Sequence, residues 1–284
     1  MIFVTTLTKH IYQFCGRKLL QSFIETGNHH EHQLYVFFEN EDDPYTEYYP
    51  EWLVEWADKP FFTFQNIMTF EYQGQRVVDY VDNLLANKIT FDHIYNSARS
   101  VKWFRPVAAM KFASDILLHG QLSSIDADCM FTSRITGAFF DSILEESNIA
   151  FLGRENFKII RHGDYDYRGN YIHTNTVQAT DADRHTETGY IGFDLDKPGT
   201  REFITRNLEY WTTGEVLELS YRTDCHTFDA TRKELANLTY NNLCAPMGEL
   251  SPIGSRVIED SILGSFLVHH KGTIGPNLYR SQQI

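Results

Sequence analysis

The sequence predicts a single α/β domain built on a central, mostly parallel sheet flanked by helices. Two observations carry this prediction. Near the N-terminus, an apolar run, a helix-like run and a second apolar run follow one another within about 40 residues, which is the order of a βαβ unit. Further along, a helix-like stretch, Gly120 and another apolar run repeat the alternation of helix and strand.

The composition sets limits on the class of protein. The 284 residues are 42% hydrophobic and 14% aromatic, which is enough for a full core. The formal net charge of -13 at pH 7 argues against a large nucleic-acid-binding surface, although a local basic groove would be compatible with it. The four cysteines form no Cys-x-x-Cys pair, so neither a zinc ribbon nor a redox motif is expected.

The sequence also predicts where the protein resides. The opening MIFVTTLTKHIYQF contains too short an apolar run for a signal peptide. No segment approaches the roughly 20 apolar residues that cross a bilayer. We therefore expect a cytoplasmic protein with no membrane partner.

The spacing of apolar residues predicts the first βαβ unit. Residues 2–7, IFVTTL, are typical of a buried strand. Apolar residues then recur at helical spacing from Ile11 to Phe23, and Gly27 is expected to end that helix. The run QLYVFFE, residues 33–39, is the second predicted strand and ends in an acid.

Later stretches predict further helices. Residues 48–56 and 77–86 have amphipathic patterning. Residues 105–119 form a strong helical pattern with Pro106 in the first turn, and LSSIDADCMF follows as a strand that runs into two aspartates. After about residue 150 the sequence is polar and is expected to be rich in loops, with helices at 198–214, 229–243 and 255–268.

The pattern Asp-x-Asp occurs four times, at 126/128, 164/166, 181/183 and 194/196, so by itself it is weak evidence for a metal site. Asp126 and Asp128 alone follow a helix, a glycine and an apolar strand, an order that leads to the carboxyl edge of a parallel sheet, where ligands bind. In an extended backbone, residues i and i+2 point to the same side, so both carboxylates could bind one hard divalent cation. The alternative interpretation is an exposed acidic pair at the end of a strand.

Five segments of the chain, taken in order, resemble a known family: FVTTLTKHIYQFCGRKLLQSF, FRPVAAMKFASDI with SSIDADCMF, ETGYIGFDL, RTDCHTFDATR and ILGSFLVHHKGTIGP. They resemble GT-A-fold glycosyltransferases, in particular small sugar transferases of bacteria and tailed phages, with some likeness to the glycogenin-type group. The resemblance implies the Rossmann-like GT-A sheet in one domain, residues 1–284. It also implies a nucleotide-sugar-binding half, about 1–130, and an acceptor-binding half, about 131–284.

The resemblance further implies roles for individual residues. Asp126 and Asp128 would bind Mn²⁺ or Mg²⁺, with Asp128 the more direct ligand and Asp126 also reaching the ribose of the donor. His269 would complete the metal shell from the C-terminal His-x-x-Gly stretch, in which Gly272 is the glycine. The resemblance also implies that Thr5, Thr6 and Tyr12 lie along the nucleotide of the donor, with Tyr12 stacking on the base. Lys102 and Arg105 would lie at the diphosphate or the donor sugar.

The C-terminal segment departs from the glycogenin-type pattern in one place. The lysine expected three residues after the glycine is Gly275 here, so Lys271 is the candidate to replace it in donor binding. His270 lies next to His269, which leaves open which of the two histidines would bind the metal.

The implied reaction moves a sugar from a nucleoside-diphosphate sugar, with a UDP-sugar expected, to an acceptor hydroxyl. An inverting enzyme needs a general base for that hydroxyl. Asp224 in RTDCH and Glu187 in TETGY are the candidates, and Asp224 is preferred. A retaining enzyme needs no such base, and the sequence does not choose between the two outcomes.

Three functions remain open at this point. The first is the metal-dependent glycosyltransferase, acting on a hydroxymethylated pyrimidine in phage-type DNA in the host cytoplasm, or on a saccharide, a protein or a small molecule. The second is a nucleotidyltransferase, against which the lack of a Gly-rich phosphate loop near the N-terminus counts. The third is a non-catalytic module that binds a nucleotide or a carbohydrate. The sequence leaves the donor sugar, its base and the oligomeric state open.

Overall fold

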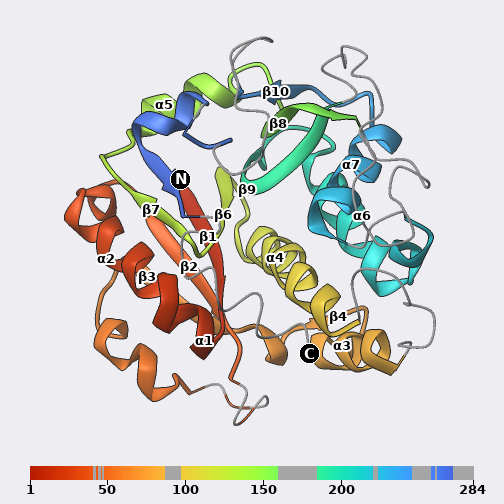
Figure 1. Ribbon diagram of the computed structural model, residues 1–284, viewed down its shortest axis with the longest axis horizontal. Helices are drawn as coiled ribbons and strands as arrows, with labels where there is room; N and C mark the ends of the chain where they lie inside the picture. Colours follow the sequence, from red (N-terminus) through yellow and green to blue (C-terminus); the bar gives the residue numbers. More distant parts are fainter. Residues whose placement is uncertain are drawn as a thin grey trace.

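A seven-stranded sheet forms the centre of the computed structural model, with strand order β10-β8-β9-β6-β1-β2-β3 (Figure 1). The structure describes residues 1–40, 43, 46, 48–86, 97–158, 184–219, 223–244, 257–259 and 261–270. Each strand of this sheet runs parallel to its neighbours except β9, which is antiparallel to both β6 and β8. The predicted mostly parallel sheet is therefore confirmed. The seven strands are β1 (Ile2–Leu7), β2 (Gln33–Phe38), β3 (Phe62–Asn66), β6 (Gln121–Ile125), β8 (Ile149–Lys158), β9 (Arg184–Asp194) and β10 (Tyr240–Asn242).

The N-terminal βαβ unit is also confirmed. Strand β1 pairs in parallel with β2, and the connection consists of α1 (Lys9–Ile11), a π-helical turn (Tyr12–Gly16) and α2 (Arg17–Glu25). Gly16 lets this connection approach β1 closely, since a Cβ there would lie 2.5 Å from a methyl carbon of Leu7. Gly27 follows the helix with φ of +76°, a conformation that glycine adopts without steric cost.

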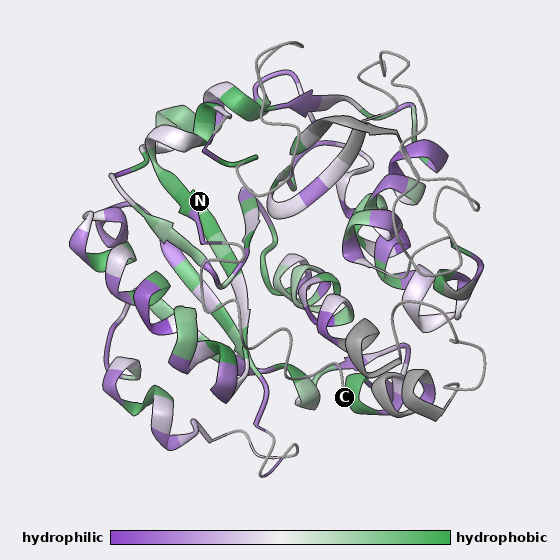
Figure 2. Cartoon of the chain, viewed as in Figure 1, coloured by the Kyte–Doolittle hydropathy of each residue, from purple (hydrophilic) through white to green (hydrophobic). Residues whose placement is uncertain are grey.

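Helices cover both faces of the sheet (Figure 1). Helices α4 (Ser97–Ile116), α6 (Thr200–Thr212) and α7 (Asp224–Glu234) pack against one face, whereas α2 and α5 (Gly137–Leu144) lie on the other. Successive strand residues alternate between the two cores: Phe3 belongs to the α2 side and Val4 to the α4 side. Figure 2 shows the resulting concentration of hydrophobic residues along the central strands.

Shorter elements complete the described chain. Helix α3 (Val77–Ala86) confirms the prediction for 77–86, and the patterning of 48–56 corresponds to a 3₁₀ helix at Glu51–Trp56. None of the helices in these ranges is both long and apolar enough to span a membrane. The remaining elements are 3₁₀ turns at Asn28–His30, Ile67–Thr69, Glu215–Glu218 and Ile262–Ser265, and the strands β4 (Glu71–Tyr72), β5 (Gln75–Arg76), β7 (Cys129–Phe131) and β11 (Leu267–His269).

Two predictions around the acid pair need correction. Helix α4 begins at Ser97, so Pro106 lies inside the helix and not in its first turn. The stretch LSSIDADCMF is not one continuous strand, because β6 ends at Ile125 and β7 begins at Cys129. Between them the Cys129 amide donates to the Asp126 carbonyl at 3.0 Å, so the two aspartates lie in a turn. Their shared direction comes from that turn and not from an extended backbone.

The second half of the chain contains more strand than predicted. Strands β8 and β9 occupy ranges that were expected to be loops. In β9 the polar residues Thr186 and Glu187 are buried and do not face solvent, and the Thr186 hydroxyl donates to Asp229 of α7. The predicted helix at 229–243 is wrong at both ends. Helix α7 begins at Asp224, where the Thr223 side chain caps the amide of His226, and residues 240–242 form β10. Where residues 255–268 are described, they form a 3₁₀ turn and β11 instead of the expected helix.

Candidate active site

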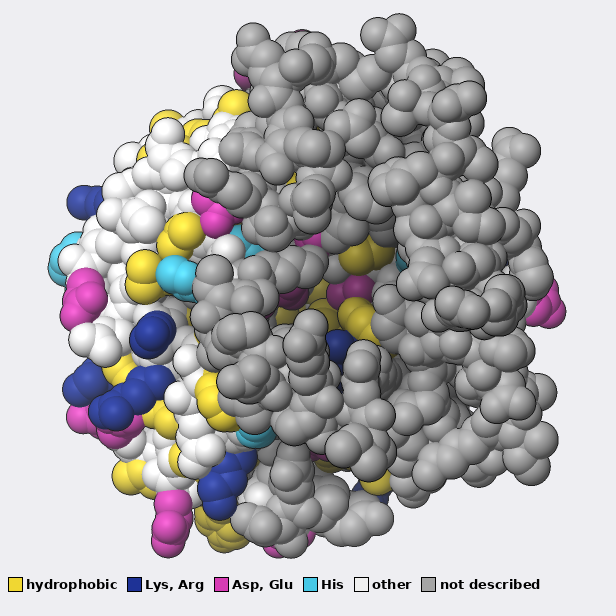
Figure 3. Space-filling view, in the orientation of Figure 1, with side chains coloured by type: hydrophobic (Ala, Val, Ile, Leu, Met, Phe, Trp, Pro, Cys, Tyr) yellow, Lys and Arg dark blue, Asp and Glu magenta, His cyan; other side chains and the backbone are white. Residues whose placement is uncertain are grey.

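Four parallel strands, β1, β2, β3 and β6, end at one edge of the sheet. Glu39 directly follows β2, and Asp126 directly follows β6. Parallel strands present their carboxyl ends on the same side, so the residues after them converge there. In the space-filling view, hydrophobic, acidic and basic side chains of the described residues are visible near the middle of this face, between the residues drawn in grey (Figure 3).

The acid pair lies in the turn between β6 and β7. The side chains of Asp126 and Asp128 are 33% and 31% exposed, so both carboxylates are open on one side. The Asp126 amide donates to the carbonyl of Gly189 on β9 at 3.1 Å, which fixes the turn to the antiparallel strand. The chain thus holds the two carboxylates in place and leaves them accessible to solutes.

His269 reaches the acid pair from the far end of the chain. Strand β11 pairs antiparallel with β7 and places His269 opposite Cys129. The His269 Nε2 atom lies 2.9 Å from Asp128 Oδ1 and 3.6 Å from Asp126 Oδ2, and its side chain is only 1% exposed. Of the two adjacent histidines, His269 is the one beside the carboxylates, whereas His270 donates its amide to the carbonyl of Asp128 at 3.0 Å.

Two of the donor-binding candidates on the N-terminal unit are buried. The side chain of Thr5, in the second half of β1, is buried, and among the described residues its hydroxyl oxygen has no hydrogen-bond partner. Thr6, next to it, is half-buried. Tyr12 is 5% exposed and accepts a hydrogen bond from Trp56 Nε1 at 2.8 Å, while its ring lies 5.0 Å from that of Trp52. The Tyr12 ring therefore packs on the segment after β2.

Arg105 and Lys102 lie on α4. The guanidinium of Arg105 forms an ion pair with Glu39 at 2.5 Å, and both side chains are mostly buried, at 19% and 14% exposed. Arg105 is therefore at the carboxyl edge of the sheet, with its charge balanced by the acid that follows β2. Lys102 is exposed, and its ammonium lies 4.2 Å from the centre of the Trp103 ring. Lys271 and Gly272 fall outside the described residues.

This architecture matches solved glycosyltransferases over nearly the whole chain. Mouse xyloside xylosyltransferase 1 has a TM-score of 0.53 at 14% identity, covering 97% of this chain and 99% of that one. The galactosyltransferase LgtC, solved in complex with donor and acceptor sugar analogues, has a TM-score of 0.52 at 12% identity, covering 96% of this chain and 87% of that one. The chain has the GT-A glycosyltransferase fold. By sequence, no protein-family model and no curated protein matches it.

The residues at the carboxyl edge of this GT-A fold suit a divalent cation. Asp126 and Asp128 offer carboxylate oxygens and His269 an imidazole nitrogen within 3.6 Å of both, a set that fits Mn²⁺ or Mg²⁺. Asp128, Cys129 and His269 form a second, overlapping group whose ligand atoms all lie within 4.8 Å of one another. The acid pair also acts on Cys15, whose thiol pKa is raised to about 12, first by burial and then by the negative charge of Asp128.

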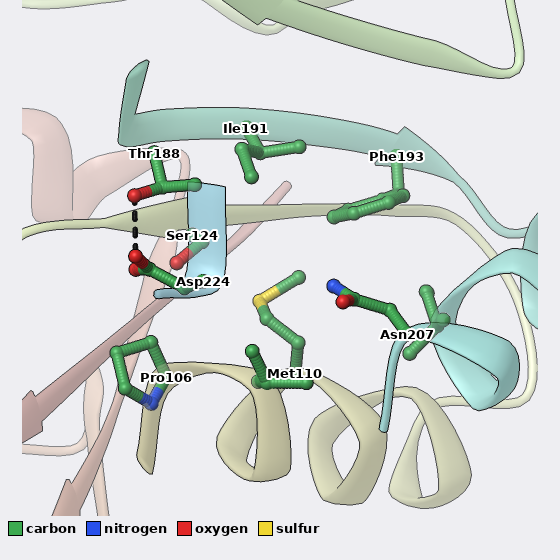
Figure 4. A pocket seen from close by; sticks show the side chains of 10 residues that line it. Pro106, Met110, Ser124, Thr188, Ile191, Phe193, Asn207 and Asp224 are labelled. Atoms are coloured by element: carbon green, nitrogen blue, oxygen red, sulfur yellow. Dashed lines mark hydrogen bonds between the residues drawn. The ribbon is translucent and has the colours of Figure 1, made fainter. Parts of the chain in front are cut away.

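Asp224 lies in a pocket between β6, β9, α4 and α6 (Figure 4). Its carboxylate accepts hydrogen bonds from Thr188 Oγ1 and from the Cys225 amide, both at 2.9 Å. The side chains of Ser124, Pro106 and Asn207 line the same cavity, whose volume of about 20 Å³ is room for one water molecule. Glu187 is 1% exposed and does not line it, so of the two predicted bases only Asp224 borders this space.

Several contributing residues were not predicted from the sequence. Gly189 lies behind His269, since a Cβ there would be 3.1 Å from His269 Cε1. Glu259 accepts the His269 amide at 2.9 Å, and Cys129 directly follows the acid pair. The adjacency of Cys129 to Asp128 was visible in the sequence, but the pairing of β7 with β11 was not. The acidic pairs at 164/166 and 181/183 fall outside the described residues. Asp194 is the last residue of β9, and Asp196 lies in the turn that follows it.

Proposed function

We propose that the protein is a metal-dependent glycosyltransferase that moves a sugar from a nucleoside-diphosphate sugar, with UDP as the nucleotide, to an acceptor hydroxyl. The observation that carries this proposal is the position of His269, 2.9 Å from Asp128 and 3.6 Å from Asp126 at the carboxyl edge of a GT-A sheet. A buried histidine brought to two half-exposed carboxylates across 141 residues of sequence is hard to explain as an acidic turn alone.

The chain's own residues have distinct tasks in this reaction. Asp126, Asp128 and His269 would hold the cation, which supplies positive charge to the leaving diphosphate when bound. Arg105 would add a second positive charge at the diphosphate or the donor sugar, and Glu39 keeps its guanidinium in position beforehand. The proposed donor site is completed by Thr5, Thr6, Lys102, Lys271 and Gly272. Tyr12 also belongs to it, after a rotation of its ring away from Trp52.

If the transfer inverts the sugar, Asp224 is the base we propose. Its carboxylate borders the pocket that Ser124 of β6 also lines, and it would accept the proton of the acceptor hydroxyl as the new glycosidic bond forms. Thr188 Oγ1 donates to one Asp224 oxygen, so this carboxylate is held in one orientation. Glu187 is the second candidate. We also propose that residues up to about 130 bind the donor and those after it bind the acceptor, except that His269 returns to the donor side.

The first experiment measures release of free sugar from UDP-, GDP- and CDP-sugars with Mn²⁺. We expect slow hydrolysis of a UDP-sugar, and a loss of at least about a hundredfold in Asp128→Ala because the charge on the leaving group is no longer stabilised. Asp196→Ala is the matched control: it removes the second carboxylate of another Asp-x-Asp pair, one that contacts His119 and Gly120 at the opposite edge of the sheet. Equal turnover by Asp128→Ala and the parent chain would rule out the proposed metal site.

The acceptor we propose is a hydroxymethylated pyrimidine in DNA. The support is the resemblance to phage sugar transferases and the basic and aromatic stretch RSVKWFRP, in which Lys102 is exposed and Arg105 is paired with Glu39. Incubation with 5-hydroxymethylcytosine DNA and the UDP-sugar should raise the mass of the DNA by one sugar residue. No change in mass, with donor hydrolysis intact, would assign the acceptor to a saccharide, a protein or a small molecule.

A further inference from the structure

Asp128 and His269 face a third metal-binding atom that the proposed reaction does not use. Cys129 is 1% exposed, and its Sγ belongs with Asp128 and His269 to a group of ligand atoms within 4.8 Å of one another. We infer that this group is a Zn²⁺ site that overlaps the catalytic metal site. By occupying it, Zn²⁺ inhibits the enzyme. The binding stands on the geometry alone, whereas the inhibition rests on the proposed function.

The strand register brings Cys129 and His269 together. They are directly opposite in the antiparallel pair of β7 and β11. The pairing hydrogen bonds lie one and three positions away, from His270 N to Asp128 O at 3.0 Å and from Thr132 N to Phe266 O at 2.8 Å. The His269 amide instead donates to Glu259. Cys129 and His269 therefore form a non-hydrogen-bonded pair, the kind in which opposite side chains lie closest.

Gly189 provides the space for both side chains on the same side of this pair. Cys129 Sγ lies 3.7 Å from the Gly189 carbonyl oxygen. A Cβ at Gly189 would lie 3.1 Å from His269 Cε1 and 3.3 Å from Nδ1. The thiol and the imidazole thus both lie against Gly189, and Asp128 reaches the imidazole from the adjoining turn.

The two overlapping ligand sets differ in one member. The oxygen-rich set uses the carboxylate of Asp126, whereas the other set uses the thiol of Cys129. Mg²⁺ and Mn²⁺ prefer oxygen ligands, but Zn²⁺ binds thiolate, imidazole and carboxylate together in tetrahedral sites. Neighbouring ligand atoms around a tetrahedral Zn²⁺ lie roughly 3.5 Å apart. Ligand atoms up to 4.8 Å apart must therefore move about 1 Å closer together when Zn²⁺ binds, and rotation of the side chains allows this.

Zinc binding here would compete with the catalytic cation. As the S–Zn bond forms, the Cys129 thiol loses its proton to solvent, so binding weakens as the pH falls. Asp128 and His269 are then drawn toward Cys129 and away from Asp126. A cation held in that position would be poorly placed for a diphosphate that depends on Asp126, and the reaction would slow.

The binding test uses Co²⁺ as a spectroscopic substitute for Zn²⁺ on the full-length, EDTA-treated chain. We expect a near-ultraviolet thiolate-to-Co²⁺ band that Zn²⁺ displaces, at one metal per chain. Cys129→Ser should abolish the band and weaken Zn²⁺ binding, measured against a chelating dye, by at least about tenfold. Absence of the band in the parent chain, or equal Zn²⁺ affinity in Cys129→Ser, would overturn the inference.

Matched variants separate this site from other places where zinc could bind. Cys225→Ser removes a different half-buried thiol and should retain the band. Asp126→Asn should also retain it, since Asp126 belongs only to the oxygen-rich set. The adjacent His29 and His30, whose rings lie 3.9 Å apart, could bind Co²⁺ without any thiolate band. If Cys129→Ser does not fold, alkylation of the parent chain still tests the zinc site. Zn²⁺ should slow the alkylation of Cys129 and leave that of Cys225 unchanged.

The inhibition is measured separately as the Zn²⁺ concentration that halves the Mn²⁺-dependent release of sugar. We expect this concentration to rise at least about tenfold in Cys129→Ser, in line with the loss of a zinc ligand. A thiolate band in a chain that transfers no sugar would support the zinc site and reject the proposed function. Sugar transfer without a thiolate band, or with unchanged Zn²⁺ sensitivity in Cys129→Ser, would support the proposed function and reject the inhibitory zinc site.

Discussion

At the scale of single residues, Gly189 determines how closely His269 can approach the acid pair. Its backbone carbonyl accepts the Asp126 amide, and its missing side chain leaves space for the imidazole. Gly189→Ala should push His269 away, because 3.1 Å is closer than a methyl carbon normally comes to a ring carbon. We expect Mn²⁺ affinity, measured by titration, to fall by about tenfold, as it does when a metal ligand loses its support.

Gly137→Ala is the matched control for that substitution. Gly137 begins α5 and has negative φ, and the nearest atom to an added Cβ is a flexible Glu31 oxygen at 3.9 Å. Its Mn²⁺ affinity should equal that of the parent chain. The same loss of affinity in both variants would mean that Gly189 acts through general stability and not through His269.

Cys15 provides a pH-dependent test of the acid pair. Its thiol pKa is raised to about 12, so the thiol stays protonated through neutral pH and gives way to the thiolate only in strong base. At pH 8 the thiolate is about one part in ten thousand, and alkylation by iodoacetamide, followed by peptide mass spectrometry, should be correspondingly slow. Asp128→Asn removes a neighbouring negative charge and should speed the reaction. Half-maximal labelling near pH 8.5 in the folded parent chain would contradict this account.

The candidate site could be predicted in part at this scale. Asp126 and Asp128 were distinguishable from three similar pairs because a strand precedes them, and His269 followed from a resemblance. The packing of Trp52 and Trp56 around Tyr12 was not predicted, since nothing local in the sequence indicates it. The pairing of Arg105 with Glu39 and the contact of Gly189 with His269 join positions more than 60 residues apart, which no local pattern encodes.

At the scale of elements, Arg206 links three helical segments in the second half of the chain. From α6, its guanidinium contacts Glu215 at 2.7 Å and Glu234 of α7 at 2.6 Å. Hydrogen bonds from Arg206 hold the pKa of both carboxyls below the usual 4.5. A lowered folded-state pKa contributes stability that is present above pH 4.5 and disappears as the pH falls through the folded-state value.

Arg206→Gln should therefore lower the free energy of unfolding at pH 7 by about 1 kcal/mol, a modest amount because both glutamates are more than a third exposed. Urea titrations at pH 7 and pH 3 should give a smaller difference between variant and parent chain at pH 3. Lys59→Gln, which breaks the exposed contact of Lys59 with Asp58, should change neither value. An Arg206→Gln deficit that is the same at both pH values would show that the lost ion pairs are not its cause.

Elements with a strong local pattern were predicted well. Strands β1 and β2 and helices α2, α3 and α6 have apolar spacing that matches their positions, and Gly27 and Gly214 follow the ends of α2 and α6. Strand β9 was not predicted because its sequence is polar. One of its polar residues, Thr186, is buried and hydrogen-bonds to Asp229 of α7. Strand β11 and the end of α7 depend on distant partners, and Pro106 obscured the earlier start of α4.

At the scale of the whole molecule, donor and metal together would connect the N-terminal strands with β11. A ligand that binds only the folded chain stabilises it by about 2.7 kcal/mol at a hundred times its dissociation constant. For a chain of this size, UDP with Mn²⁺ should raise the melting temperature by roughly 5 °C. Thermal-shift measurements with UDP, GDP and CDP identify the nucleotide that the donor carries. Asp128→Ala should show no Mn²⁺-dependent shift in melting temperature. A shift of the same size in Asp128→Ala would place the nucleotide elsewhere.

The late position of His269 in the sequence matters while the chain is being synthesised. The last strand of the central sheet ends at Asn242, and β11 begins at Leu267. A ribosome needs about 1 to 5 seconds to translate the residues between them. A chain released in that interval would carry all seven central strands but lack the histidine beside Asp128. Such a truncated product would also lack Leu267 and, when released early in the interval, Ile258 and Leu263, which are buried in the core on the α2 side. Premature termination would therefore leave both the proposed metal site and this core incomplete.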